Sequence, residues 1–293
     1  MEQNVYFFIG KGGVGKSTCS AIFAYQQARK ERKVVLNSID PAHNLSDIFE
    51  NKLSNKVSKV RNNLFALETD IDIWVKRYLK EIENEMRYTY KHQTAFNVGK
   101  YFKTLRYSPG LEEYAILLAI QDTLEKNKDK DIIVFDTPPT ALTIKFISLP
   151  YSSLIWLNQL SDLRNVILEK KEIITRIHKG KKNEKETDNV LLKLNGMVSE
   201  FRILVDKFKS EGFHYIVVIN PDKLSLFEST RIKNEFENLK ININSVILNK
   251  YIGEKTFLKK VKDVFPDSKI SLLEKQQEEI IGLECIDKQK LIL

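Results

Sequence analysis

The sequence predicts an α/β fold, in which a large and mostly parallel sheet is flanked by helices and carries a helical subdomain formed by insertions. Apolar runs rich in Val, Ile and Phe at residues 5–9, 34–38 and 132–135 lie among helical patterns. Such runs are typical of parallel strands that are buried on both faces. A glycine-rich segment at 10–18 directly follows the first run. A chain of 293 residues can form one large core or two modest ones.

The remaining elements follow from the same patterns. Further strands are expected at 215–219 and 245–248, with weaker candidates at 64–67 and 269–272. Helical periodicity without a strand pattern marks two insertions, 71–107 and 151–212, which we expect to form the helical subdomain of a single domain spanning 1–293. The second insertion should contain an amphipathic helix, because nine apolar residues share one helical stripe: Val190, Leu191, Leu194, Met197, Val198, Phe201, Leu204, Val205 and Phe208. Segment 179–188 has no apolar anchor and is predicted to be a mobile loop.

Composition narrows the class of protein. The net charge of +8 could attract nucleic acid or an anionic membrane surface, or it could reflect Lys and Glu interleaved on solvated helix faces. Cys19 and Cys285 stand far apart, which argues against a disulfide framework and a Cys-x-x-Cys zinc site. The N-terminus lacks the features of a secretory signal. The longest uninterrupted apolar run, 114–120, is far shorter than the roughly 20 residues of a spanning helix. We therefore expect a soluble, cytoplasmic protein.

The glycine-rich segment carries the most specific motif. Gly10, Gly15, Lys16 and Ser17 fit the pattern G-x-x-x-x-G-K-[ST], between an apolar strand and a helix expected at 21–30. Glycines let backbone N–H groups converge on phosphate oxygens, and a helix N-terminus adds partial positive charge. The motif predicts a P-loop NTPase in which Lys16 contacts the β- and γ-phosphates and Ser17 ligates Mg²⁺. The expected phosphate-binding residues are Gly10, Lys11, Gly12, Gly13, Val14, Gly15, Lys16, Ser17 and Thr18.

Two acidic segments follow predicted strands and should lie beside this loop. The run 40–47 begins with Asp40 after the second strand, and Asp136 ends the third. Ligands of open α/β folds bind at the carboxyl edge of the sheet, where these strands end. A carboxylate that ends a buried strand is the Walker B arrangement, which places Asp136 as a Mg²⁺ contact through water. The three segments are therefore expected to converge on one site.

Together these segments resemble the ArsA family, which includes the arsenite-pump ATPase and the ATPases that deliver tail-anchored membrane proteins. Lys11 is similar to the extra lysine of the deviant Walker A motif in SIMIBI-class ATPases. The run Asp-Pro-Ala-His-Asn-Leu-Ser-Asp at 40–47 matches the switch I of the family, and 136–150 is similar to its switch II. Segments 108–113, 243–249 and 279–284 resemble its Pro-Gly-Ile-Asp-Glu segment, its adenine-side strand and its C-terminal Glu-Val-x-Gly-x-Glu segment. The resemblance covers nearly the whole chain.

The resemblance implies that ATP and Mg²⁺ are cofactors and that the chain forms a homodimer or a tetramer. By this resemblance Asp40 would orient or activate the attacking water, and Lys11 would reach the partner subunit's nucleotide. Asn249 would contact adenine, and Ile252 replaces the carboxylate that would read guanine, which favours ATP. His43 would be a switch residue. The residues alone leave other readings open: Asp40 or Asp136 could cap a helix, and Asn249 could simply end a strand.

The sequence also departs from the family. Its two cysteines cannot supply a three-thiolate metalloid site, it lacks the Cys-x-x-Cys pair that joins some relatives through zinc, and 271–275 contains no proline beside the expected adenine position. Targeting relatives build a client groove where the insertions lie. There the chain offers apolar residues that could hold an apolar helix or pack against one another: Trp74, Tyr78, Leu79, Phe96, Tyr101, Phe102, Leu154, Ile155, Trp156, Leu157, Leu160 and Val166.

Three functions are compatible with these observations. The resemblance favours an ATP-hydrolysing switch that captures hydrophobic helices of tail-anchored clients, with a membrane receptor as a further partner. An ATPase that drives arsenite or antimonite efflux is the alternative, and the missing cysteines count against it. A positioning ATPase similar to ParA and MinD, bound to DNA or membrane, fits the charge but not the long switch I match, so nucleic acid is the least favoured partner.

Overall fold

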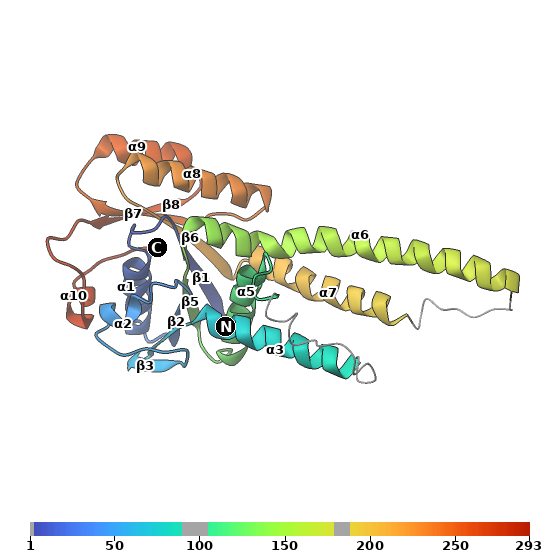
Figure 1. The fold of residues 1–293 in the computed structure, drawn as a ribbon. Helices are drawn as coiled ribbons and strands as arrows, with labels where there is room; N and C mark the ends of the chain where they lie inside the picture. Colours follow the sequence, from blue (N-terminus) through green and yellow to red (C-terminus); the bar gives the residue numbers. More distant parts are fainter. Residues whose placement is uncertain (1–2, 90–104, 179–187) are drawn as a thin grey trace. The chain divides into compact units, whose positions relative to one another are not determined.

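A computed structural model describes residues 3–89, 105–178 and 188–293 (Figure 1). Most strands of its sheet lie in the first and the last of these ranges. The chain forms two compact units. We call the first the sheet unit, Met1–Phe146 with Glu211–Leu293, and the second the helical unit, Ile147–Ser210. Phe96, Tyr101 and Phe102 of the predicted client groove lie outside the described residues, as does 179–187 of the predicted loop.

The sheet unit contains eight strands in the order β3-β4-β2-β5-β1-β6-β7-β8. Their bounds are β1 (Asn4–Ile9), β2 (Val34–Ser38), β3 (Ser58–Arg61), β4 (Leu64–Glu68), β5 (Ile132–Asp136), β6 (Phe213–Ile219), β7 (Ser245–Tyr251) and β8 (Lys269–Glu274). All neighbouring strands in this order are parallel, except that the edge strand β3 pairs antiparallel with β4. The predicted α/β fold is confirmed, including both weaker strands. Strand β3 was missed because it is a polar, incompletely buried edge strand.

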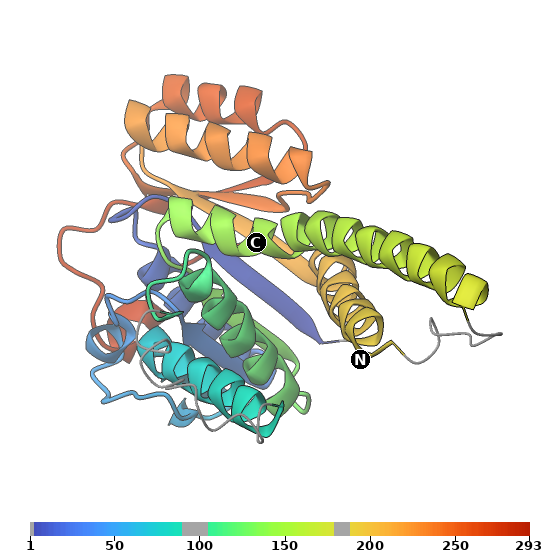
Figure 2. The same ribbon diagram turned by 45° about the vertical axis from the view of Figure 1, so that its right-hand side comes forward.

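Helices cover both faces of this sheet (Figures 1 and 2). Helix α1 (Lys16–Arg29) shares one core with Phe8, Leu36 and Val134. Because successive side chains of a strand point to opposite faces, residues such as Asn37 and Tyr215 face the other side of the sheet. On that face the Asn37 side chain donates a hydrogen bond to Thr123 of α5 (Leu111–Lys126). The Tyr215 ring contacts the Phe236 ring of α8 (Lys223–Asn238) on the same face. The other helices of the sheet unit are α2 (Leu45–Ile48), α3 (Ile71–Thr89), α9 (Lys255–Val264) and α10 (Leu283–Asp287).

Helix α3 packs on α5 within the sheet unit. Val75, Leu111 and Ala115 form a small buried cluster, and Trp74, Tyr78 and Leu79 lie against it. In the described part of the first insertion, three of the apolar side chains that were proposed for a client groove are therefore partly buried against this cluster. That 71–107 and 151–212 together form one helical subdomain stays a prediction.

The helical unit consists of most of α6 (Thr140–His178) and of α7 (Asn189–Lys209). Helix α6 begins in the sheet unit and continues from Ile147 into the helical unit, where it contains Pro150. Asp188 caps α7 by accepting the Leu191 N–H at 2.8 Å, and Arg164 of α6 pairs with the same carboxylate at 2.6 Å. This pair holds the pKa of Asp188 down, to about 2.

The predicted stripe of α7 is buried only in its C-terminal half. Phe201, Leu204, Val205 and Phe208 are buried, whereas Val190 and Met197 are exposed. Helix α6 also exposes large apolar side chains along the helical unit: Ile155, Trp156, Leu163, Val166, Ile167 and Ile173. Hydrophobic periodicity identifies an apolar stripe but not the surface that covers it, so the exposed half could not be predicted.

One described helical stretch, Thr140–Ile173, is long and apolar enough to cross a membrane by length and composition, and 33% of its most apolar window is buried. Counting uninterrupted apolar residues missed it, because Ser, Asn and Gln interrupt the run without making the helix strongly polar. Buried helices of water-soluble proteins can pass the same test.

Candidate functional site

The loop between β1 and α1 leaves no room for a side chain at two of its glycines. A side chain at Gly10 would place its Cβ 2.4 Å from the carbonyl oxygen of Val218 on β6. Gly15 has a φ of 92°, and a Cβ there would lie 2.4 Å from Nδ2 of Asn249. A positive φ strains a residue that has a side chain, and close approach of neighbouring atoms leaves no space for one. The two glycines of the motif are therefore required by the packing of the loop against neighbouring strands.

Helix α1 begins at Lys16, directly after this loop. Its N-cap, Gly15, provides no side-chain hydrogen bond, so the first N–H groups of the helix remain available for a ligand. The Lys16 side chain is buried, and its Nζ lies 3.4 Å from the Lys11 carbonyl oxygen and 3.6 Å from Asp40 Oδ2. The arrangement brings a cation and unpaired N–H groups to the same place, as a phosphate site requires.

Asp40 lies opposite Lys16, two residues after the end of β2. It is 8% exposed, and its Oδ1 accepts the N–H of Ala42 at 3.0 Å, which fixes the turn at the start of switch I. His43 follows with a φ of 48° and donates its backbone N–H to the Asp40 carbonyl at 3.2 Å. Two of the predicted segments thus meet at the Lys16–Asp40 pair.

Asp136 is the last residue of β5 and lies close enough to Lys16 and Asp40 to interact with both charges. It pairs in register with Phe8 and Ser38, and Ser38 in turn pairs with Glu68. Residues in register on parallel strands point to the same face, so Asp136, Ser38 and Glu68 form one polar row at the carboxyl edge, on the α1 side. Ser38 Oγ donates to Asp136 Oδ2 at 3.2 Å. We call these three residues the polar row.

The Asp136 carboxylate is completely buried, and burial raises its pKa to about 6. The Ser17 hydroxyl and the Lys16 ammonium oppose this rise, Asp40 adds to it, and Ser38 opposes it. Oδ1 of Asp136 has no hydrogen-bond partner within the described residues. A buried carboxylate oxygen with a free acceptor, close to the Ser17 hydroxyl, fits a Mg²⁺ ion held by the hydroxyl directly and by the carboxylate through water.

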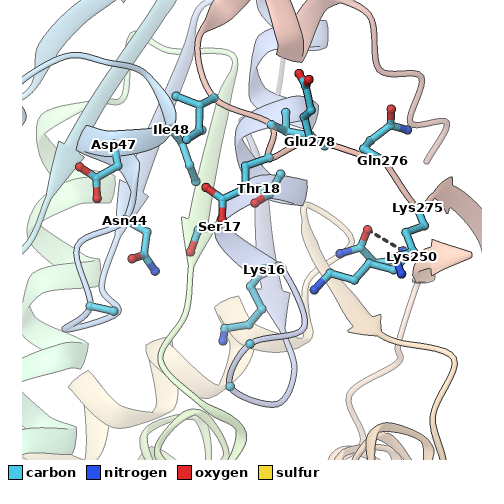
Figure 3. Close-up of a pocket in the computed structure, with 18 of the residues that line it drawn as sticks. Lys16, Ser17, Thr18, Asn44, Asp47, Ile48, Lys250, Lys275, Gln276 and Glu278 are labelled. Atoms are coloured by element: carbon cyan, nitrogen blue, oxygen red, sulfur yellow. Dashed lines mark hydrogen bonds between the residues drawn. The ribbon is translucent and has the colours of Figure 1, made fainter.

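A cavity of about 720 Å³ opens above the loop (Figure 3). Lys16, Ser17 and Thr18 lie at its centre, with Asn44, Asp47 and Ile48 on one side and Lys250, Lys275 and Gln276 on the other. Its volume is in the range of small-molecule sites. Its lining comes from the loop, switch I, Pro139 of switch II, the end of β7 and the segment after β8: Gly12, Gly13, Gly15, Lys16, Ser17, Thr18, Asp40, Ala42, Asn44, Asp47, Ile48, Pro139, Asn249, Lys250 and 274–281.

Asn249 is a wall of the cavity and a support of the loop. Its Nδ2 donates to the Val14 carbonyl oxygen at 2.7 Å, and its Oδ1 accepts the Lys250 N–H at 2.9 Å. The segment after β8 is tied to switch I, because the Gly282 N–H donates to the Ile48 carbonyl oxygen at 2.9 Å. The predicted contact of Asn249 with adenine stays a prediction.

The structure brings most predicted residues together. Eight of them line the cavity, namely Gly12, Gly13, Gly15, Lys16, Ser17, Thr18, Asp40 and Asn249. Of the others, Gly10 packs against Val218 of β6, Val14 and Asp136 are buried, and Lys11 is partly exposed. Sequence analysis overlooked Ser38 and Glu68 of the polar row and Gln276 to Glu278 of the lining. The signal for the first two was a polar residue at the end of an apolar strand.

The loop, the buried lysine and the two strand-end carboxylates define a P-loop ATPase. The model of the anion-transporting ATPase (ArsA) family matches residues 3–293. The chain belongs to this family, and it is an ATPase of the P-loop class.

Individual relatives are similar over most of the chain. "Putative arsenical pump-driving ATPase 2" of Aquifex aeolicus is 29% identical over 298 residues, which covers 96% of each chain. "Putative arsenical pump-driving ATPase 1" of the same organism is 28% identical, covering 98% of this chain and 77% of that one. The "ATPase ASNA1 homolog" of Plasmodium berghei is 28% identical, covering 85% of this chain and 63% of that one.

The raised pKa of Asp136, about 6 against an ordinary 3.8, gives a prediction for pH. The native carboxyl binds a proton more tightly than the unfolded one, so its contribution to stability is present below about pH 4 and is lost as pH rises through about 6. Replacing Asp136 by Asn should therefore raise the free energy of unfolding of the nucleotide-free protein at pH 8 by about 1–3 kcal/mol. Urea unfolding from pH 4 to pH 8 measures this. Parallel stability curves for the two proteins would contradict it.

Proposed function

We propose that this ATPase is a homodimeric switch that captures apolar helices of membrane-protein clients and releases them when ATP is hydrolysed. The nucleotide site supports the switch, and the exposed apolar side chains of α6 and α7 support the capture of a helix. The second of these observations carries the proposal, because it separates a helix carrier from other ATPases of the same fold.

The chain's own residues have distinct roles in this proposal. The loop N–H groups and Lys16 would bind the β- and γ-phosphates, and Ser17 and Asp136 would hold a Mg²⁺ ion that supplies positive charge beside them. Asp40, placed against Lys16, orients the attacking water. Lys11 lies outside the cavity wall, which suits a side chain that acts on the partner subunit's nucleotide. Asn249 braces the loop and contacts the base.

Switch I links the site to movement. Asn44, Asp47 and Ile48 form one side of the cavity, so the γ-phosphate and its bound water would set the position of this segment and hydrolysis would release it. Pro139 of switch II also lines the cavity, directly before α6 begins at Thr140. The covalent path from switch II to the helical unit is therefore short.

The apolar surface of the helical unit has the spacing of a helix-binding face. Trp156 and Leu163 are seven residues apart on α6, as are Val166 and Ile173, and all four are exposed. Residues seven apart lie on one face of a helix, and contiguous exposed apolar side chains mark interaction sites. Val190, Leu192, Met197 and Ile203 add exposed apolar area on α7. An apolar transmembrane helix is the occupant that this surface suits.

Light scattering after size exclusion tests the proposal. For the Asp40→Asn variant in the presence of ATP, we expect the mass of two chains. A peptide that contains one apolar transmembrane helix should co-elute with this dimer. The double variant Trp156→Glu, Leu163→Glu should lose the peptide but keep the dimer, since charges on the face oppose burial of an apolar helix. Asn158→Glu, an exposed polar position on the same helix, is the matched control. A dimer that ignores the peptide would exclude the client role.

Arsenite efflux is the second candidate, because two relatives are named as arsenical pump-driving ATPases. Arsenite should then accelerate ATP hydrolysis. Cys19 is a poor ligand for it, since the thiol is completely buried and burial raises its pKa to about 12, which keeps it protonated. A positioning ATPase on DNA would instead show binding that falls steeply with salt.

A further inference from the structure

Helix α2 cannot hold its own position. It has four residues, Leu45–Ile48, and its N-cap Asn44 makes no side-chain capping bond. Isolated helices of this length are unstable in water. Yet α2 and its N-cap supply Asn44, Asp47 and Ile48 to the cavity wall. Contacts from the rest of the sheet unit must therefore fix the helix and, with it, switch I.

Leu45 and Ile48 of α2 are buried in the core that α1 shares, and Glu68 adds two hydrogen bonds to the first turn. Its Oε1 accepts the backbone N–H of Ser46 at 2.9 Å, and its Oε2 accepts the Ser46 hydroxyl at 2.7 Å. The Ser46 hydroxyl in turn accepts the N–H of Leu53 at 3.1 Å. One carboxylate thereby fixes both the first turn of α2 and the chain that leaves it. Hydrogen bonds to an ionised acceptor are about twice as strong as neutral ones.

The surroundings make this carboxylate hard to replace. Glu68 is 7% exposed, and within the described residues it takes part in no ion pair with Lys, Arg or His. A buried carboxylate without a cation depends on its hydrogen bonds for stability. If Ser46 moved away, both oxygens would lose these bonds. Glu68 and Ser46 are therefore expected to separate only at a high cost in free energy.

Glu68 is also fixed to the part of the sheet that carries the metal residue. It ends β4 and pairs in register with Ser38, which pairs with Asp136 and donates to it. Its backbone N–H donates to the Ser54 carbonyl oxygen at 3.0 Å. The polar row thus holds Asp136 at one end and α2 at the other, on one rigid edge of the sheet.

We propose that Glu68 is the positioning residue of switch I: through Ser46 it fixes α2 and thereby places Asp40 against Lys16 and the γ-phosphate. The inference rests on the proposed role of Asp40 in hydrolysis. Glu68 touches neither phosphate nor water in this proposal, and it acts through Ser46.

Four variants test the proposal: Glu68→Ala, Glu68→Gln, Ser46→Ala and the double variant Glu68→Ala, Ser46→Ala. Ser268→Ala is the matched control, because it removes one partly buried hydrogen bond, to the Ile243 carbonyl oxygen at 2.7 Å, far from switch I in the sequence. Each protein is examined for steady-state ATP hydrolysis, ADP affinity and amide hydrogen exchange of residues 44–53.

We expect Glu68→Ala to lower kcat about tenfold or more while ADP affinity changes less than about threefold. Exchange should quicken at 44–53 alone. Glu68→Gln should recover much of the kcat and of the exchange protection at 44–53, because its amide oxygen still accepts the Ser46 N–H. The double variant should lose less than the sum of the two single variants, since both changes remove the bond between the Ser46 hydroxyl and Glu68; Ser46→Ala also removes the bond from the Leu53 N–H. Ser268→Ala should lower thermal stability without changing kcat.

The two proposals can fail separately. If Asp40→Asn hydrolyses ATP normally, the role of Asp40 is wrong, and Glu68 is then judged by exchange at 44–53 and by the double variant. Unchanged exchange and kcat in Glu68→Ala would overturn the positioning role. So would a loss of protection spread evenly over the protein, or single-variant effects that simply add.

Discussion

Replacing Lys16 by Met is expected to lower the affinity for ADP and ATP by roughly 100-fold or more, because charged hydrogen bonds contribute about 1.5–3 kcal/mol each. Lys16 is 5% exposed at the centre of the cavity, at the start of α1. Its ammonium group would therefore interact with a bound phosphate with little screening by water. Isothermal titration with each nucleotide gives the change directly.

Lys11→Met is the matched control for Lys16→Met. The two residues are of the same type and five positions apart, but Lys11 is partly exposed and does not line the cavity. We expect Lys11→Met to keep nucleotide affinity and to lower hydrolysis only where two chains can associate. Thermal unfolding of both variants checks that the fold is intact. If Lys16→Met bound ADP as tightly as wild type, the phosphate assignment would have to be abandoned.

The second large effect is expected from Asp40→Asn. A group that orients or deprotonates water contributes about 10²–10⁴-fold to the rate, so kcat should fall by that order while KM changes little. Asn keeps the oxygen that accepts the Ala42 N–H, 3.0 Å away in the native protein, so the turn of switch I should persist. Only the negative charge opposite Lys16 is lost. Single-turnover hydrolysis at saturating ATP separates this effect from binding.

Asp47→Asn provides the comparison for Asp40→Asn. Asp47 lines the same cavity from α2 but is exposed to solvent. The same chemical change there should leave kcat within about threefold of wild type, since exposed charges interact weakly across water. Equal losses at Asp47 and Asp40 would mean that cavity charge in general, and not the position of Asp40, controls hydrolysis.

Local sequence was enough to predict the sheet and the loop. Buried parallel strands are continuous apolar runs, so seven of the eight strands could be found, and Gly10 to Ser17 formed a motif whose spacing is fixed by the size of a phosphate. The edge strand β3 escaped because Ser58–Arg61 is polar and incompletely buried. Helix α1 begins at Lys16, five residues before the helix expected from periodicity, because glycine and polar residues at its start carry no apolar pattern.

The contacts of the site that sequence analysis missed join residues that lie far apart along the chain. Glu68 meets Ser46 across 22 residues, and Asn249 meets Val14 across 235. No local pattern marks either pair, because each depends on strand order and register. The segment after β8 reaches the cavity for the same reason, through the bond from Gly282 to Ile48.

The sequence by itself determined the α/β class, the phosphate loop and the family, because backbone geometry around a phosphate and burial on both faces of a sheet leave few choices of residue. Only the tertiary structure decided which polar groups share an edge of that sheet and which apolar faces are left uncovered. The order β4-β2-β5-β1 placed Glu68, Ser38 and Asp136 in one row. The folding of α6 and α7 left Trp156 and Leu163 exposed, since a periodic stripe specifies a face but not its partner.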